Sequence, residues 1–185
     1  MNRVSRHPEC NEMEGVAQKV DVNDLVAVGG DGQQFLTFML AGEEYGVDIL
    51  RVQEIKGWDN VTKIPNTPEY IRGVINLRGT IVPIIDMRLR FGLPFLEYGV
   101  TTVVIVLKVI APGGRSRIMG IIVDGVSDVY NISREEMKEA PDFGTAVDTK
   151  FVSSMTTVNE KMVILLDIDH MCNSAELASM DSAVE

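Results

Sequence analysis

At 185 residues, the chain has room for one large domain or two small lobes. Its net charge of −10 argues against a nucleic-acid binder and against docking on anionic lipid, because both need a cationic surface. The two cysteines, Cys10 and Cys172, lie far apart, and no apolar run approaches the roughly 20 residues of a membrane helix. We therefore expect a cytoplasmic protein without a disulfide framework and without direct membrane insertion.

The first 32 residues differ from the rest of the chain. They contain no aromatic residue, carry six acids against three bases and end in a glycine-rich run. This composition predicts a flexible N-terminal leader over 1–32. A folded domain is expected over 33–183.

Short apolar runs separated by turn residues follow in the first half of that domain. We predict strands over 35–41, 45–47 and 52–57, with a turn over 42–44 and with Asp48 capping a single helical turn. Thr67, Pro68 and Glu69 together predict a helix start, which Gly73 would end. Strands over 74–77 and 80–85 flank a turn, and a proline at position 83 places the second of them at a sheet edge or beside a bulge.

The second half shows the same pattern. Asp86 is the predicted N-cap of a turn of helix over 87–91. Strands are predicted over 101–110, 117–123, 126–132, 151–158 and 161–166, with Asp124-Gly125 as a tight turn. A terminal helix over about 168–180 would present one apolar stripe, formed by Ile168, Met171, Cys172 and Ala175.

About ten strands at hairpin spacing favour an all-β fold with a few short helices, built as an antiparallel sandwich or as barrels. No internal repeat is evident in the sequence.

The residues that usually carry catalysis or bind metals do not occur in the required patterns. The histidines, His7 and His170, have no partner at metal-ligand spacing, so a helix cap beside a surface histidine is the expectation for 167–170. Cys172 lies on the apolar stripe of the terminal helix, which favours a buried and inert thiol. The sequence therefore predicts no catalytic residue, no metal and no cofactor.

One region departs from the acidic balance of the chain. Between Tyr70 and Phe91 there are four arginines and one acid. Arg78 lies at a glycine turn between two apolar strands, so it is either an ordinary solvated turn residue or an anchor in a protein interface. Glu54 raises the same question, because alternation along 52–56 would put it on one face with an exposed Val52, as at the rim of a groove.

These residues belong to motifs by which the chain resembles the CheW family of coupling proteins of bacterial chemotaxis. The resemblance covers roughly 33–183 and is carried by FLTFML at 35–40, EYGVDILRVQEI at 44–55, NTPEYIRGVINLRGTIVPIID at 66–86 and GIIVDGVSDV at 120–129.

The resemblance implies a fold of two five-stranded, SH3-like β-barrel lobes that share a core, with a C-terminal helix. It implies an adaptor without catalysis of its own, which binds the regulatory domain of the CheA histidine kinase and the cytoplasmic tip of methyl-accepting chemotaxis proteins. Such an adaptor would be recruited to membrane-associated receptor arrays. Carried over by motif, the receptor-binding residues are Val52, Glu54, Gly73, Arg78, Ile122 and Val123.

Two other functions stay open at this point. A small-molecule-binding barrel would need a dry cavity of several hundred cubic ångströms inside a lobe. An enzyme would need an unrecognised site around His170.

Overall fold

The computed structural model describes residues 32–141 and 149–173. The predicted leader, apart from Gly32, lies outside the described residues, as does the predicted terminal helix beyond position 173.

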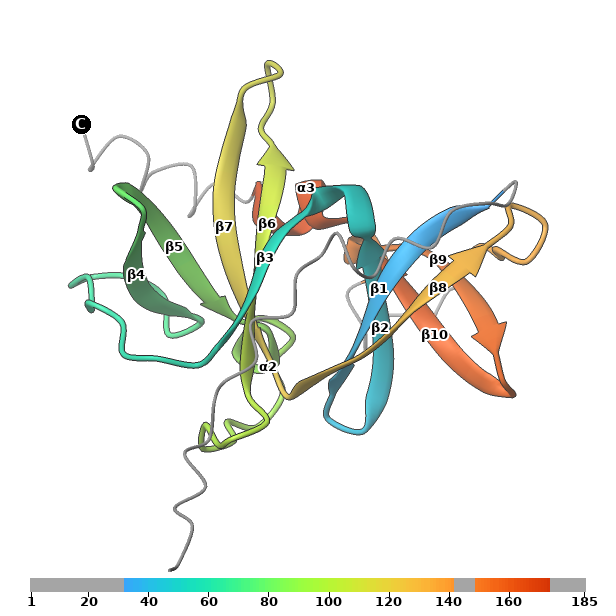
Figure 1. Ribbon diagram of the computed structural model, residues 1–185, viewed down its shortest axis with the longest axis horizontal. Coiled ribbons are helices and arrows are strands. Elements are labelled where there is room, and N and C mark those ends of the chain that lie inside the picture. Colours follow the sequence, from blue (N-terminus) through green and yellow to red (C-terminus); the bar gives the residue numbers. More distant parts are fainter. Residues whose placement is uncertain (1–31, 142–148, 174–185) are drawn as a thin grey trace, which may run out of the picture.

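The described residues form two five-stranded sheets, which we call lobe A and lobe B (Figure 1). In lobe A the order across the sheet is β8 (Gly125–Ile132), β1 (Gln33–Leu40), β2 (Glu43–Asp48), β10 (Lys161–Leu166) and β9 (Val152–Val158). In lobe B the order is β3 (Val52–Gly57), β6 (Val103–Ile110), β7 (Ser116–Val123), β5 (Thr80–Asp86) and β4 (Ile71–Leu77). Four short helical segments lie between or after these strands: η1 (Ile49–Arg51), α2 (Met87–Arg90), η3 (Thr149–Phe151) and α3 (Ile168–Cys172). The predicted fold class, mostly β with two five-stranded lobes, is confirmed.

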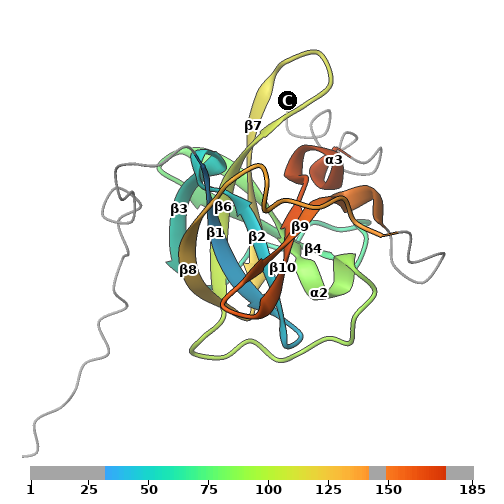
Figure 2. The ribbon, with the colours of Figure 1, turned by 90° about the vertical axis from the view of Figure 1, so that its right-hand side faces the viewer.

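Each sheet curls towards closure through a single bridge after its outer strand. In lobe B, Thr62 follows β3 and exchanges two hydrogen bonds of 2.9 Å with Val74 on β4. In lobe A, Lys138 follows β8 and exchanges two hydrogen bonds of 2.7 Å with Met155 on β9. The bridges partly cover the outer edge of β4 in lobe B and of β9 in lobe A, which gives the lobes the curled shape in Figure 2.

Three groups of buried apolar side chains stabilise this arrangement. One fills lobe B, with Ile84, Val104 and Val106 among its members. A second fills lobe A around Phe35 and Leu165. The third and largest draws residues from both sheets and from α3, so the lobes share a core, as the resemblance implied.

The two halves of the chain repeat the same order of elements. Half 1 runs from β1 through β5 to α2, and half 2 runs from β6 through β10 to α3. Each half gives its first two strands to one lobe and its last three strands to the other. The antiparallel and parallel pairings follow the same scheme in both lobes, including a bulge where β3 meets β6 and where β8 meets β1.

Packing contacts repeat as well. Gly46 of β2 pairs in parallel with Leu165 of β10, and Gly120 of β7 pairs in parallel with Ile84 of β5. A Cβ would lie 2.8 Å from Leu165 Cδ2 in the first case and 2.5 Å from Ile84 Cδ1 in the second. Each glycine therefore leaves room for a side chain from the other half. This repeat was not evident in the sequence, because few equivalent positions hold the same residue.

The predicted helix caps are confirmed. The Asp48 side chain accepts a hydrogen bond from the Leu50 N–H, and the Asp86 side chain accepts one from the Leu89 N–H. Asp167 caps α3 in the same way through the His170 N–H, and His170 is exposed.

The predicted helix at Thr67 is wrong. The Thr67 hydroxyl donates to the Ile64 carbonyl, and the Ile71 N–H donates to the Pro68 carbonyl in a single turn. The chain then enters β4, whose backbone pairs with β5 on one side and with Thr62 on the other. Gly73 lies inside this strand, not at a helix end.

The predicted tight turn at Asp124-Gly125 is also wrong, because β7 and β8 lie in different sheets. The chain bends at Asp124, but this bend leads from lobe B to lobe A and does not pair β7 with β8 (Figure 1). Pro83 lies on an internal strand of the sheet. It is tolerated because the main chain of Val74, its partner on β4, bonds to Thr62 instead, and because a bulge in the β4–β5 pairing follows.

Candidate functional site

The predicted receptor-binding residues come from β3, the β4–β5 hairpin and the end of β7. In β3 the pairing with β6 contains a bulge, because Val52 opposes Leu107 while Glu54 already opposes Val106. The extra residue, Gln53, shifts the alternation of side chains between the two faces. Val52 is consequently 6% exposed and belongs to the shared core, which corrects the expectation of an exposed valine.

Glu54 and Arg78 meet across lobe B. Arg78 Nη2 lies 3.4 Å from Glu54 Oε2, and the side chains are 72% and 16% exposed respectively. The structure thus brings together the two charged residues that the sequence singled out. Because the arginine is so exposed, this ion pair adds little to stability and leaves most of the guanidinium open to a partner.

The hairpin turn explains how Arg78 is presented. Arg78 and Gly79 both have positive φ, of 51° and 87°, as a two-residue hairpin of the right twist requires. The Asn76 side chain fixes the turn by accepting a hydrogen bond of 2.8 Å from the Gly79 N–H. The arginine therefore projects from a rigid support.

The other candidate residues lie beneath the surface. Gly73, with φ of 141°, passes so close to Thr62 that a side chain would strike the Thr62 backbone. Ile122 packs inside lobe B, and Val123 packs in the shared core. Gly73, Ile122 and Val123 can shape a surface, whereas Glu54 and Arg78 can touch a partner.

One exposed residue close to this pair in sequence was missed. Ile81, three residues after Arg78 on β5, is 44% exposed although it is a large apolar residue. Its equivalent in half 2, Met162 on β10, is also exposed. Side chains alternate between the two faces of a strand, so with Val82 and Ile84 facing the core of lobe B, Ile81 could have been placed on the face that points to solvent.

Two side chains that could take part in catalysis, Cys172 and Tyr98, are buried or hydrogen-bonded within the fold. Burial raises the pKa of the Cys172 thiol to about 12, as expected of an inert cysteine. The Tyr98 hydroxyl donates a hydrogen bond of 2.6 Å to Asp86, and burial together with this bond raises the pKa of Tyr98. Over 32–141 and 149–173, no three His, Cys, Asp or Glu side chains could hold a metal ion together.

Two large hollows in the described part of the chain are open surface depressions. One, of about 390 Å³, lies beside Arg72 and Phe95, and another, of about 480 Å³, lies beside Ile110 and His170. The interiors of both lobes are occupied by packed side chains, which disfavours the small-molecule barrel. In the part of the chain that the structure describes, no helix is long and apolar enough to cross a membrane.

Comparison with known proteins adds to this picture. The family described as "CheW-like domain" matches residues 34–176. A protein named chemotaxis protein CheW from Klebsiella aerogenes is 47% identical over 154 residues, which are 83% of this chain and 90% of that protein. One of the same name from Bacillus subtilis is 36% identical over 75% of this chain and 84% of its own length. The crystal structure of a scaffolding protein CheW from Thermoanaerobacter tengcongensis superposes with a TM-score of 0.70 at 34% identity, covering 78% of this chain and 95% of that one.

Proposed function

We propose, from the premise that this chain belongs to the CheW-like family, that it acts as a scaffold of bacterial chemotaxis and carries out no reaction itself. The match over 34–176 is the observation that carries this conclusion. The structure supports it, because rigid surfaces are what an adaptor needs and the reactive groups described above are buried or engaged in the fold.

The receptor-binding surface is centred on Glu54 and Arg78. A helical receptor tip would contact the exposed guanidinium, while Val52, Gly73, Ile122 and Val123 hold the backbone beneath it in shape. An arginine on a rigid turn loses little side-chain freedom on binding, and Arg is enriched among residues that dominate interface energies.

The second partner is the regulatory domain of the CheA kinase. An exposed apolar residue at the end of a barrel suits this contact, and Ile81 is such a residue. Binding both partners would recruit the chain to receptor arrays and place kinase and receptor in fixed register.

A calorimetric titration tests the proposal. The purified protein is titrated with a receptor tip and with the CheA regulatory domain, separately and together. Arg78→Ala should weaken receptor binding by about 5- to 150-fold, the effect of losing an interface hot spot of roughly 1–3 kcal/mol. Kinase binding and the unfolding temperature should change little, because the Arg78 side chain is 72% exposed and its ion pair with Glu54 adds little to stability.

Arg115→Ala is the matched control, because Arg115 is an exposed arginine on the β6–β7 hairpin, away from this site. It should leave both affinities unchanged. Equal receptor affinity for the wild type and for Arg78→Ala would remove Arg78 from the site. Failure of the wild type to bind either partner would overturn the proposed function.

A further inference from the structure

Two clusters of polar contacts join the halves of the chain. The first, latch 1, is centred on Asp124, where the chain crosses from lobe B to lobe A. The Arg88 guanidinium on α2 donates to both carboxylate oxygens of Asp124, at 2.8 and 2.7 Å. The same carboxylate accepts a hydrogen bond of 2.8 Å from the Ala41 N–H, at the end of β1.

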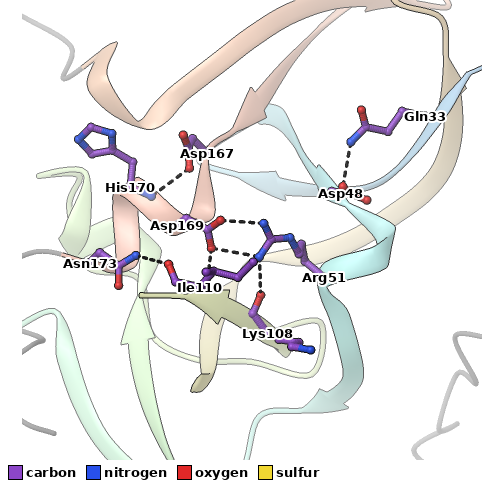
Figure 3. A network of polar contacts seen from close by, with 9 residues as sticks. All are labelled: Gln33, Asp48, Arg51, Lys108, Ile110, Asp167, Asp169, His170 and Asn173. Carbon is purple, nitrogen blue, oxygen red and sulfur yellow. Dashed lines mark hydrogen bonds and ion pairs between the residues drawn. The ribbon is translucent and has the colours of Figure 1, made fainter. Parts of the chain in front are cut away.

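The second cluster, latch 2, is shown in Figure 3. Arg51, where the chain crosses from lobe A to lobe B, donates to both carboxylate oxygens of Asp169 on α3, at 3.1 and 2.7 Å. Asp169 also accepts a hydrogen bond of 2.7 Å from the Ile110 N–H, at the end of β6. Arg51 donates a further bond to the Lys108 carbonyl.

The latches occupy equivalent places in the repeat. Arg88 and Asp169 are each the second residue after the aspartate that caps their helix. Ala41 lies four residues after Thr37, which pairs with Gly46 in the β1–β2 hairpin. Ile110 lies four residues after Val106, which pairs with the equivalent Gly120 in the β6–β7 hairpin. Each latch therefore consists of a helix residue and a hairpin end from one half, held by the crossover residue of the other half.

In latch 1 the helix residue is the arginine and the crossover residue is the aspartate, whereas in latch 2 these two charges are exchanged. Half 1 supplies both arginines, Arg51 and Arg88, and half 2 supplies both aspartates, Asp124 and Asp169. Their side chains are 16% to 30% exposed, so solvent screens these pairs less than it screens surface pairs. The Arg88 guanidinium also holds the pKa of Asp124 below its usual range, as a carboxylate in close contact with an arginine should.

We propose that this polarity makes each half of the chain pair with the other half and not with a second copy of itself. Two copies of half 1 would bring Arg51 against Arg88, and two copies of half 2 would bring Asp124 against Asp169. Because the two halves repeat the same order of elements, two copies of the same half could form a similar interface in a dimer, and like charges facing each other are a barrier to that pairing. The inference rests on the fold and does not depend on the proposed partners.

Four double variants of the full chain test it, all with the wild-type net charge. Two exchange charges within a latch: Arg51→Asp with Asp169→Arg, and Arg88→Asp with Asp124→Arg. Two exchange charges between latches: Arg88→Asp with Asp169→Arg, and Arg51→Asp with Asp124→Arg. Only the second kind places like charges together in the native fold, and it also makes each half complementary to itself.

Thermal unfolding and light scattering at increasing protein concentration are the measurements. Within-latch variants should stay monomeric and unfold above the between-latch variants, since all four variants equally lose one aspartate that accepts a hydrogen bond from the Ala41 or Ile110 N–H. Between-latch variants should unfold at least about 5 °C lower and populate dimers. If only the between-latch variants fail to fold, the result also supports the proposal, because all four variants carry the same kinds of substitution and the same net charge and differ only in which charges face each other. Equal unfolding temperatures and equal masses for all four variants would overturn it.

Discussion

Gly73 lies in the candidate receptor site, yet the structure predicts that substituting it acts through the fold. In a Gly73→Ala variant, the new Cβ would lie 2.8 Å from the Thr62 carbonyl carbon and closer still to its oxygen. A backbone group cannot move aside as a flexible side chain can. The two hydrogen bonds between Thr62 and Val74 would therefore be strained or lost.

The expected loss has two parts. Alanine at a φ of 141°, in a region essentially limited to glycine, costs about 1–3 kcal/mol in backbone conformation. The two weakened hydrogen bonds cost about 0.5–1.5 kcal/mol each. Together these give about 2–6 kcal/mol, or a fall of about 4–24 °C in the unfolding temperature of a domain of this size.

Gly79→Ala is the control, because Gly79 also has positive φ but nothing lies within 4 Å of its Cβ position. It should lose only the conformational part, about 2–8 °C at the same scale. Differential scanning calorimetry of both variants makes the comparison. Equal losses at Gly73 and Gly79 would refute the clash with Thr62. Receptor binding by Gly73→Ala should fall with the folded fraction, unlike that of Arg78→Ala in fully folded protein.

Two further predictions concern buried or paired groups. In a Cys10→Ser variant at pH 8, a disulfide reagent should label Cys172 only after denaturant is added, because burial raises the pKa of that thiol to about 12; rapid labelling of the native protein would contradict this. For Asp124, hydrogen bonding from Arg88 lowers the folded-state pKa, so the stabilisation is present above the unfolded value of about 3.9 and is lost as pH falls through the folded value. The stability difference between the wild type and Asp124→Asn in urea should therefore be full at pH 7 and smaller at pH 3, and a difference that grows on acidification would argue against it.

Local patterns predicted most of the strands because the signals are local. Alternating apolar residues and turn residues place strand ends within a few positions. Asp48 and Asp86 cap their helical turns as expected, since a cap depends on the two or three residues that follow it. Asn159 and Glu160 likewise form the turn between β9 and β10.

Tertiary pairing explains the errors. Thr67 has the sequence of a helix start, but the bridge from Thr62 to Val74 draws the chain that follows into a sheet. A turn dipeptide such as Asp124-Gly125 does not specify which sheet the next strand joins. The crossover between lobes was therefore indistinguishable from a hairpin.

The candidate site was predicted in part for the same reason. Glu54 and Arg78 were singled out by charge and by turn position, and they do meet. Val52 was assigned to the wrong face because the bulge at Gln53 exists only through pairing with β6, some fifty residues later. The pairing of the latch residues could not be predicted, although Arg88 lies in the arginine-rich region and Asp124 in the predicted turn, because it depends on a repeat that few shared residues reveal.

The way lobe A is assembled has a consequence for a growing chain on the ribosome. Lobe B is continuous from Val52 to Val123, so its strands emerge together. The hairpin β1–β2 emerges earlier, yet its outer neighbour β10 follows only about 120 residues later. Until then the edge of β2 has no strand beside it and is a target for chaperones, proteases and other nascent chains. The edge of β2 is therefore covered only after β10 has been translated.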